Sequence, residues 1–172
     1  MRCVLYRAAI LTASDKGAAG LREDVSSMVA KTLLEEAGYQ VVSMQVLPDE
    51  RAELGAHMAN ICDTNQADLL ITTGGTGLSP RDWTPEATLD IAQRQVYGIS
   101  EAMRAYSMTI TPRGMLSRGV SVIREKTLII NLPGSPKAVK ENLTYLLPIL
   151  AHGLDILTEQ AKECATERGK TE

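Results

Sequence analysis

The chain has 172 residues, enough for one domain that buries its own hydrophobic core. Its formal charge of −3 argues against bulk attraction to nucleic acid or a membrane, and its 44% hydrophobic and 23% charged residues are typical of a soluble protein. The three cysteines have no C-x-x-C spacing and the two histidines are far apart, so we expect a cytoplasmic protein without a disulfide framework, structural zinc or membrane segment.

The first half of the chain alternates apolar runs with segments of helical periodicity. Strands are expected at residues 7–13, 41–47 and 68–73, because each is a short apolar run that ends in polar residues, proline or glycine. A polar loop is expected at 14–22, and amphipathic helices at 23–37, which Gly38 ends, and at 50–63. This β-α-β-α-β order predicts a largely parallel sheet with helices on both faces.

The second half begins with two expected helices, at 85–93 and 100–108, followed by a loop through residues 112–118. Two runs at 120–124 and 127–132 predict an antiparallel hairpin, because only two residues connect them. A long helix should then reach about residue 160, with a break or kink near Pro148. The charged residues 163–172 should form a frayed tail beyond a single core at about 7–160.

The run LLITTGGTGLSPRDWTPEAT, residues 69–88, is the candidate active site. An apolar strand that leads into glycines and then a helix can bind phosphate, because glycine lets N–H groups approach the anion and the helix start adds partial positive charge. Neither G-x-G-x-x-G nor a Gly-Lys-Ser/Thr sequence is present, so a standard nucleotide fingerprint is missing. The alternative is a tight turn in which the glycines serve only backbone conformation.

Carboxylates and hydroxyls follow the first three expected strands. Ser14 and Asp15 follow the first, Asp49 the second, and Asp82 lies after the glycines that end the third. Ligands of parallel sheets bind beyond the carboxyl ends of the strands, so these residues should share one edge. Asp49 and Asp82 can then hold Mg²⁺, which takes one or two carboxylates with substrate phosphates and water. The alternative for each is a local role, as a helix cap or a loop closure.

Positive groups are expected at the same edge. Lys16, Arg81 and Lys137 can neutralise a phosphoryl group, although each is individually typical of a solvated surface charge. Thr84 and Ser135 both precede a proline, which predicts two hydroxyl N-caps with proline at the first helical position. Both helix starts can face one anionic ligand, or they can serve as caps alone.

The runs ILTASDKGAAG, LPDE, TTGGTGLSPRDWTPEAT, TPRGMLSRG and NLPGSPKAVKE resemble the molybdopterin adenylyltransferases of molybdenum cofactor synthesis. The resemblance covers about residues 7–155, and TTGGTG is shared with related molybdopterin-binding domains. It implies a three-layer α/β/α sandwich with a mostly parallel sheet and a C-terminal β-hairpin, and often a homotrimer. It also implies Mg²⁺-dependent transfer of the adenylyl group of ATP to molybdopterin, with release of pyrophosphate, possible handover to a metal-inserting protein, and no nucleic-acid partner.

By motif position, the resemblance implies functional roles for Asp49 and Asp82 as catalytic and metal-binding residues. It also implies substrate-binding loops at these residues: Ser14, Asp15, Gly74, Gly75, Thr76, Gly77, Glu101, Pro133, Gly134 and Ser135. The chain departs from the family at Ser27 and Met28, where Gly-Pro is usual, and at Val122 and Glu125, where glycines are usual.

Three functions remain possible from the sequence. The first is the adenylyltransferase. The second is a non-catalytic molybdopterin-binding or scaffold protein, against which the retention of both aspartates counts. The third is a paralogue that acts on a related pterin, including one destined for tungsten.

Overall fold

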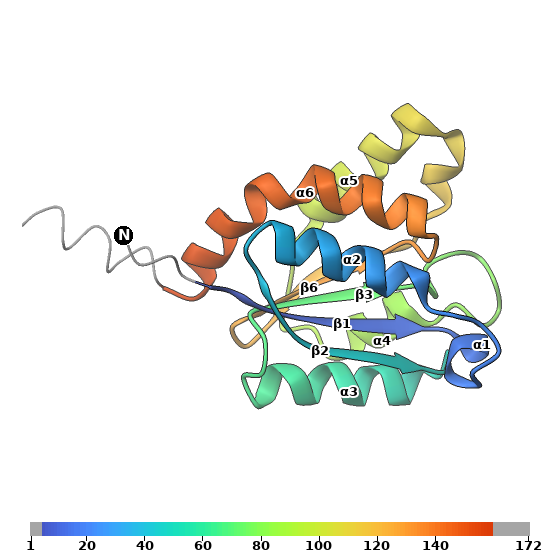
Figure 1. Ribbon diagram of the computed structural model, residues 1–172, viewed down its shortest axis with the longest axis horizontal. Coiled ribbons are helices and arrows are strands. Elements are labelled where there is room, and N and C mark those ends of the chain that lie inside the picture. Colours follow the sequence, from blue (N-terminus) through green and yellow to red (C-terminus); the bar gives the residue numbers. More distant parts are fainter. Residues whose placement is uncertain (1–4, 160–172) are drawn as a thin grey trace, which may run out of the picture.

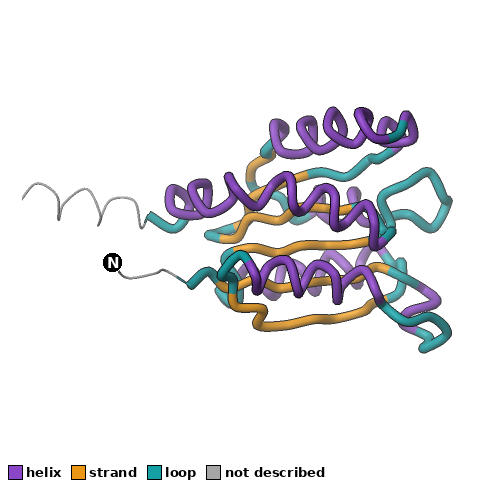
Figure 2. Tube along the Cα trace, turned by 45° about the horizontal axis from the view of Figure 1, so that its top comes forward, coloured by secondary structure: helices purple, strands orange, loops and turns teal. Residues whose placement is uncertain are grey.

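Every apolar run expected to be a strand lies in one six-stranded sheet of the computed structural model, which describes residues 5–159 (Figures 1 and 2). The spatial order is β2-β1-β3-β6-β5-β4, in which β2, β1, β3 and β6 are parallel and β5 pairs antiparallel with both β6 and β4. The expected tail at 163–172 lies outside the described range. The strands are β1 Arg7–Ala13, β2 Gln40–Leu47, β3 Leu69–Thr73, β4 Arg94–Gln95, β5 Ser121–Arg124 and β6 Thr127–Leu132.

Helices cover both faces of the sheet, which confirms the predicted α/β/α sandwich. One face packs against α2 (Val25–Glu36), α5 (Tyr97–Ile110) and α6 (Pro136–Leu157), and the other against α3 (Arg51–Asp63) and α4 (Thr84–Asp90) (Figure 1). Two predicted loops contain short helices, α1 (Asp15–Ala18) and the 3-10 helix η1 (Pro112–Leu116). In the part of the chain described, no helix is long and apolar enough to cross a membrane.

The two hydrophobic cores follow from the two-residue period of the strands. On β1, Ala8 and Ile10 belong to the core beneath α2, α5 and α6, whereas Ala9 and Leu11 belong to the core above α3 and α4. All residues of β3 and β6 are buried, as expected for central strands with helices on both faces. The central strands therefore fix the position of the loops that follow them.

Of the break or kink predicted near Pro148, the break is absent, because α6 continues from Pro136 to Leu157. Pro148 is exposed, so water can satisfy the carbonyl oxygen that loses its helical partner. Leu146, Leu150 and Leu154 are buried on one face of the helix and hold it against the sheet on both sides of the proline. Tertiary packing has therefore overridden the local preference of proline.

The hairpin between β5 and β6 shows how the chain accommodates its two departures from glycine. Val122 is fully buried in the core above α3 and α4. Glu125 has φ +52°, a left-handed conformation that favours glycine. The Gln93 side chain accepts a hydrogen bond from the Glu125 N–H at 2.8 Å and donates one to its carboxylate at 2.6 Å. These two bonds support a turn that is sterically unfavourable for glutamate.

We predict that Glu125→Gly stabilises the protein by about 1 kcal/mol, because glycine removes the steric cost of the left-handed turn. The exposed side-chain bond to Gln93 that is lost contributes little, and the backbone bond remains. The measurement is the urea midpoint of unfolding. Glu125→Ala is the control, which loses the side-chain bond but keeps the strain and should lower the midpoint. A midpoint for Glu125→Gly at or below wild type would contradict the prediction.

Candidate active site

The carboxyl ends of the parallel strands meet at one edge of the sheet, as predicted (Figure 1). The register aligns Ala13 with Leu47 and Thr73 with Leu132. The Ser14 N–H donates to the carbonyl oxygen of Leu47 at 2.9 Å, so the loops after β1 and β2 begin in contact. This edge gathers the loops that follow the strands, at residues 14–15, 48–49, 74–82 and 133–135.

The turn after β3 requires glycine at two successive positions. Gly74 and Gly75 have φ +85° and +63°, and a Cβ on Gly74 would lie 2.4 Å from the carbonyl oxygen of Ala13. A Cβ on Gly75 would lie 2.3 Å from the Thr84 hydroxyl oxygen and 3.1 Å from Oδ1 of Asp49. The conformational role of these glycines is therefore established, and it also brings bare backbone close to polar side chains.

In the backbone of this turn, the carbonyl oxygens are hydrogen-bonded, whereas the N–H groups have no acceptor among the described residues. The carbonyl oxygen of Gly75 accepts from the Thr84 N–H at 3.1 Å, that of Thr76 from the Arg118 N–H at 2.9 Å, and that of Gly77 from the Arg118 Nε at 2.7 Å. The N–H groups of Gly75, Thr76 and Gly77 donate to no acceptor within residues 5–159. A run of free N–H groups beside paired carbonyls is a suitable anion-binding surface.

The two loop aspartates hold each other. The Asp15 N–H donates to Oδ2 of Asp49 at 2.9 Å, and the Asp49 N–H donates to Oδ1 of Asp15 at 3.0 Å. The capping interpretation of Asp49 is wrong, because the N-cap of α3 is Glu50, which makes no side-chain cap bond. Asp82 does close its own loop, since its Oδ2 accepts from the Ser79 N–H at 3.1 Å.

Asp49 has a buried carboxylate oxygen without a partner. Its Oδ1 is inaccessible to solvent and accepts no hydrogen bond from the described residues. Burial raises the pKa of the Asp49 carboxyl, and the negative charges of Asp15 and Asp82 raise it further. Hydrogen bonds from Arg81 lower the pKa of the Asp15 carboxyl instead. A buried carboxylate oxygen that lacks a donor can receive a cation or a proton.

Of the three basic side chains expected at this edge, Arg81 lies there in an ion-paired state. Its guanidinium donates to both oxygens of Asp15, at 3.0 and 2.9 Å, and to Glu50 at 2.8 Å. Lys137 is exposed and pairs with Glu141 at 3.8 Å, and Lys16 is exposed in α1. The charge of Arg81 is therefore used to hold Asp15, and through Asp15 the Asp49 backbone.

The two predicted hydroxyl caps have different outcomes. Ser135 is the N-cap of α6, and its side-chain oxygen accepts from the Ala138 N–H at 3.2 Å. Thr84 is not a cap, because α4 begins at Thr84 itself after Trp83. Its hydroxyl is buried beside Gly75 and has no hydrogen-bond partner among the described residues. Of these two residues, only Ser135 is a helix cap, and it lines both cavities described below.

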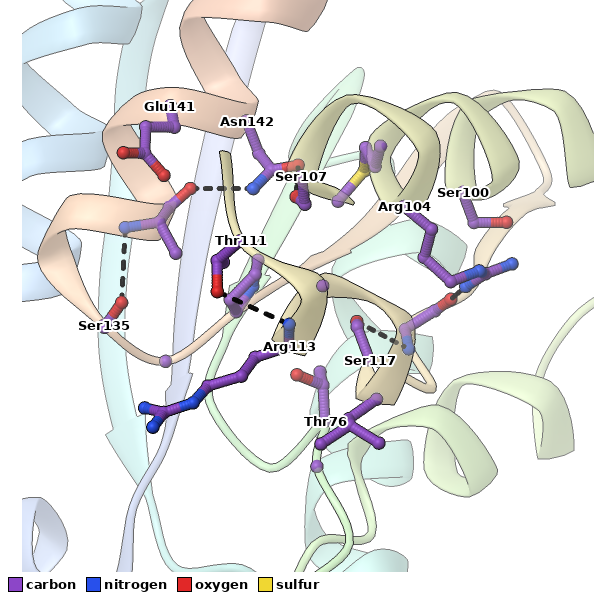
Figure 3. A pocket seen from close by; sticks show the side chains of 18 of the residues that line it. Thr76, Ser100, Arg104, Ser107, Thr111, Arg113, Ser117, Ser135, Glu141 and Asn142 are labelled. Carbon is purple, nitrogen blue, oxygen red and sulfur yellow. Dashed lines mark hydrogen bonds between the residues drawn. The ribbon is translucent and has the colours of Figure 1, made fainter. Parts of the chain in front are cut away.

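A cavity of about 490 Å³ lies on one side of the glycine turn. Figure 3 shows its polar walls: Arg104 and Ser107 come from α5, Arg113 from η1, and Asn142 from α6. The Ser107 hydroxyl donates to Asn142 at 3.2 Å, which joins two of these walls. The Arg113 guanidinium makes no hydrogen bond or ion pair with residues 5–159, and it remains available to an anionic ligand.

A second cavity of about 420 Å³ lies on the other side of the turn, between the loops after β1 and β2 and the start of α2. The Ser26 hydroxyl donates to the carbonyl oxygen of Gly134 at 2.7 Å, and Asp24 caps α2 by accepting from the Ser27 N–H. The Ser27 departure from glycine therefore still allows a capped helix at this wall. Four residues line both cavities: Gly75, Asp82, Gly134 and Ser135.

The structure brings the predicted site residues to these cavities, with the exceptions of Asp15 and Glu101. Glu101 lies on α5 rather than on a loop, is exposed, and lines neither cavity. Its neighbours Ser100 and Arg104 line the first cavity instead. Arg104 and Arg113 were not selected from the sequence, although the amphipathic helix followed by the basic TPRGMLSRG run was a usable signal.

Comparison with known proteins places these features in context. Residues 9–152 match the family model described as "Probable molybdopterin binding domain". The molybdopterin adenylyltransferase of Helicobacter pylori is 38% identical over 150 residues, which are 86% of this chain and 85% of that protein. The solved structure of the molybdopterin biosynthesis enzyme MoaB from Thermus thermophilus is 42% identical, with a TM-score of 0.85 over 90% of this chain and 98% of that one. The tungsten cofactor synthesizing protein MoaB from Pyrococcus furiosus is 29% identical, with a TM-score of 0.81 over 90% and 98%.

We predict that Gly75→Ala destabilises the protein by about 1–3 kcal/mol, because a methyl group would clash with the Thr84 hydroxyl in a left-handed turn. Gly153→Ala is the matched control, since its Cβ meets nothing within 4 Å and alanine favours the interior of α6. Denaturant unfolding should show a loss for the first variant and a small gain for the second. If the two variants had equal unfolding midpoints, the turn would accommodate the methyl group without loss of stability, and the prediction would be wrong.

The opposite pKa shifts of the two aspartates predict opposite stability changes. The pKa of Asp49 is raised in the folded protein, so its negative charge destabilises the fold. This destabilisation begins as pH rises above the ordinary pKa of 3.8 and reaches its full size above the folded-state pKa. Asp49→Asn should therefore raise the thermal midpoint at neutral pH, with a gain that shrinks as pH falls. Asp15 stabilises above 3.8 and loses this contribution as pH falls through its lowered pKa. Asp15→Asn should therefore lower the neutral-pH midpoint. If both variants shifted the thermal midpoint in the same direction at neutral pH, this account would be contradicted.

Proposed function

Because the chain belongs to the molybdopterin-binding domain family, we propose that it is a molybdopterin adenylyltransferase of molybdenum cofactor biosynthesis. ATP is the adenylyl donor, and the phosphate of molybdopterin is the acceptor. The 38% identity to molybdopterin adenylyltransferases over most of both chains supports this activity. We further propose that the protein acts in the cytoplasm as a homotrimer and passes its product to a metal-inserting protein.

The observation that carries the proposal is the junction of the two cavities. Gly75, Asp82 and Ser135 line both, and the free N–H groups of the turn lie beside this junction. A transferase of this kind must hold two anionic substrates so that one phosphate faces another. Two cavities that share a wall formed by the glycine turn and the Asp82 carboxylate suit that requirement better than a single pocket does.

In the proposed reaction, a phosphate oxygen of molybdopterin attacks the α-phosphorus of ATP. A new phosphorus–oxygen bond forms, the bond to the bridging oxygen breaks, and pyrophosphate leaves with the electron pair. The acceptor phosphate is already an anion, so no general base is needed. The N–H groups of Gly75, Thr76 and Gly77 stabilise the charge on the phosphoryl oxygens, and the α6 start at Ser135 binds a second anionic group.

The donor set fits a magnesium ion held jointly with substrate. Residues 5–159 contain no group of three or more His, Cys, Asp or Glu side chains that could hold a metal alone. Asp49 does present a buried oxygen without a partner, and Asp82 is close enough for its charge to raise the Asp49 pKa. These two carboxylates would hold Mg²⁺ together with phosphate oxygens, as the ion prefers. Bound there, it would neutralise phosphate charge during transfer.

Two other functions are distinguished by what happens to ATP. A non-catalytic scaffold would bind molybdopterin in the same cavities without consuming ATP. A paralogue would transfer the adenylyl group to a related pterin, including one destined for tungsten, and the Pyrococcus furiosus likeness favours keeping this alternative. The reciprocal backbone hydrogen bonds that hold Asp15 and Asp49 leave Oδ1 of Asp49 buried without a partner in the described chain, and this favours the enzyme, because a scaffold has no need of such an oxygen.

We predict that Asp82→Asn lowers adenylyl transfer by about 100-fold while molybdopterin affinity falls much less, because the lost charge acts on the phosphates undergoing transfer. The assay combines protein, molybdopterin, Mg²⁺ and ATP labelled at the α-phosphate, and follows labelled pterin together with released pyrophosphate. Asp90→Asn is the control. Asp90 is the exposed last residue of α4, pairs with Arg51 of α3 and lines neither cavity. Unchanged transfer by Asp82→Asn would refute its role. Tight pterin binding by wild type without transfer would favour the scaffold.

A further inference from the structure

We propose that Arg118 is a positioning residue that turns the N–H groups of the glycine turn toward the anion. This inference rests on the proposed function, in which that turn binds phosphate. Arg118 lies between η1 and β5, more than thirty residues along the chain from the turn, and it belongs to neither the sequence-derived site nor the residues that line the cavities. Its role is visible only from its hydrogen bonds.

Arg118 binds three carbonyl oxygens of one loop. Its N–H donates to Thr76 at 2.9 Å, its Nε to Gly77 at 2.7 Å, and its Nη2 to Asp82 at 2.6 Å. The guanidinium is planar and rigid, so its two side-chain bonds constrain the direction of both carbonyls as well as their position. One residue therefore fixes both ends of the loop that carries Asp82.

The direction of these carbonyls determines where the N–H groups point. In a trans peptide the carbonyl and the next N–H point in opposite directions, and the described chain has no cis peptide bond. The bonds from Arg118 to Thr76 and Gly77 therefore direct the N–H groups of Gly77 and Leu78 away from Arg118. They also neutralise two carbonyl dipoles that would otherwise repel a phosphate.

Arg118 is itself held by two neighbours. Its Nη1 donates to the Glu86 carboxylate on α4, and both side chains are only partly exposed, at 34% and 28%. The Arg104 guanidinium from α5 donates to the carbonyl oxygen of Gly119 at 2.8 Å, which fixes the adjacent peptide. A carboxylate partner is needed because a guanidinium facing only carbonyl oxygens would be an uncompensated charge.

The test compares Arg118→Lys with Arg124→Lys. Arg124 is a matched control because it also binds a carboxylate, Asp63, and a backbone carbonyl, Ile91, but it lies at the opposite edge of the sheet. Lysine at 118 keeps the charge and the backbone bond to Thr76, but it cannot hold the carbonyls of Gly77 and Asp82 in fixed directions, so the Leu78 N–H and the position of the loop that carries Gly77 are no longer fixed. The measurements are kcat and KM for adenylyl transfer, the affinity for inorganic pyrophosphate, and the unfolding midpoint of each variant.

We expect Arg118→Lys to lower kcat by about 10- to 100-fold with a smaller change in KM for ATP, as for a misplaced transition-state contact, and to weaken pyrophosphate binding. Arg124→Lys should keep wild-type kcat and pyrophosphate affinity at a comparable loss of stability. If both variants lose stability equally and both keep wild-type kcat and pyrophosphate affinity, the inference is wrong. If kcat fell equally in Arg118→Lys and Arg124→Lys, the inference would also be wrong, because the fall would then result from the loss of stability that both variants share.

Two further results keep the inference separable from the proposed function. If wild-type protein binds pyrophosphate but transfers no adenylyl group, the proposed function fails, and the two pyrophosphate affinities alone decide the role of Arg118. If Arg118→Lys does not fold, Glu86→Gln carries the test, since it loosens the guanidinium without removing it and should weaken pyrophosphate binding severalfold. Wild-type affinity in Glu86→Gln would then overturn the inference, as would a wild-type protein that binds no pyrophosphate.

Discussion

The close approach of the turn after β3 to the end of β1 is the constraint on which the rest of the site depends. The Ala13 carbonyl oxygen lies 2.4 Å from the position that a Cβ on Gly74 would occupy, so only glycine fits. The next residue then falls beside Asp49 and Thr84, from two other elements. A parallel sheet with both faces covered makes this contact possible, because its strand ends cannot shift without moving two buried cores.

Much of this arrangement could be predicted from local sequence. The five longer strands, their parallel or antiparallel pairing and the sharing of one edge by Asp15, Asp49 and the glycine turn follow from apolar runs and the properties of parallel sheets. The two-residue strand β4 was not predicted, since so short a segment carries no periodicity. Local patterns therefore predicted which loops lie together at the candidate site but described its polar contacts incompletely.

The errors share a physical cause, which is that long-range contacts decide the outcome at ambiguous positions. Thr84 has the residue type and the following proline of an N-cap, yet its hydroxyl is buried beside Gly75, and the helix begins one residue earlier than expected. Pro148 has the local signal of a helix break, but buried leucines on both sides hold α6 continuous. Arg118 has no local signal at all, because its partners Gly77 and Asp82 lie about forty residues away in the sequence.

The charges around the turn have separate roles, and together they suggest how two carboxylates could face the anionic substrate that we propose. Arg81 is paired with Asp15 and Glu50, and Arg118 with Glu86 and backbone carbonyls, so neither guanidinium is free for a phosphate. Arg113 in the first cavity and Arg22 in the second have no hydrogen-bond or ion-pair partner for their guanidinium among the described residues, and they line different cavities. Asp49 and Asp82 would repel the phosphates unless a cation lay between them. The donor set therefore favours binding by N–H dipoles and a shared divalent cation, rather than by a cluster of arginines, as the source of positive potential at the junction of the two cavities.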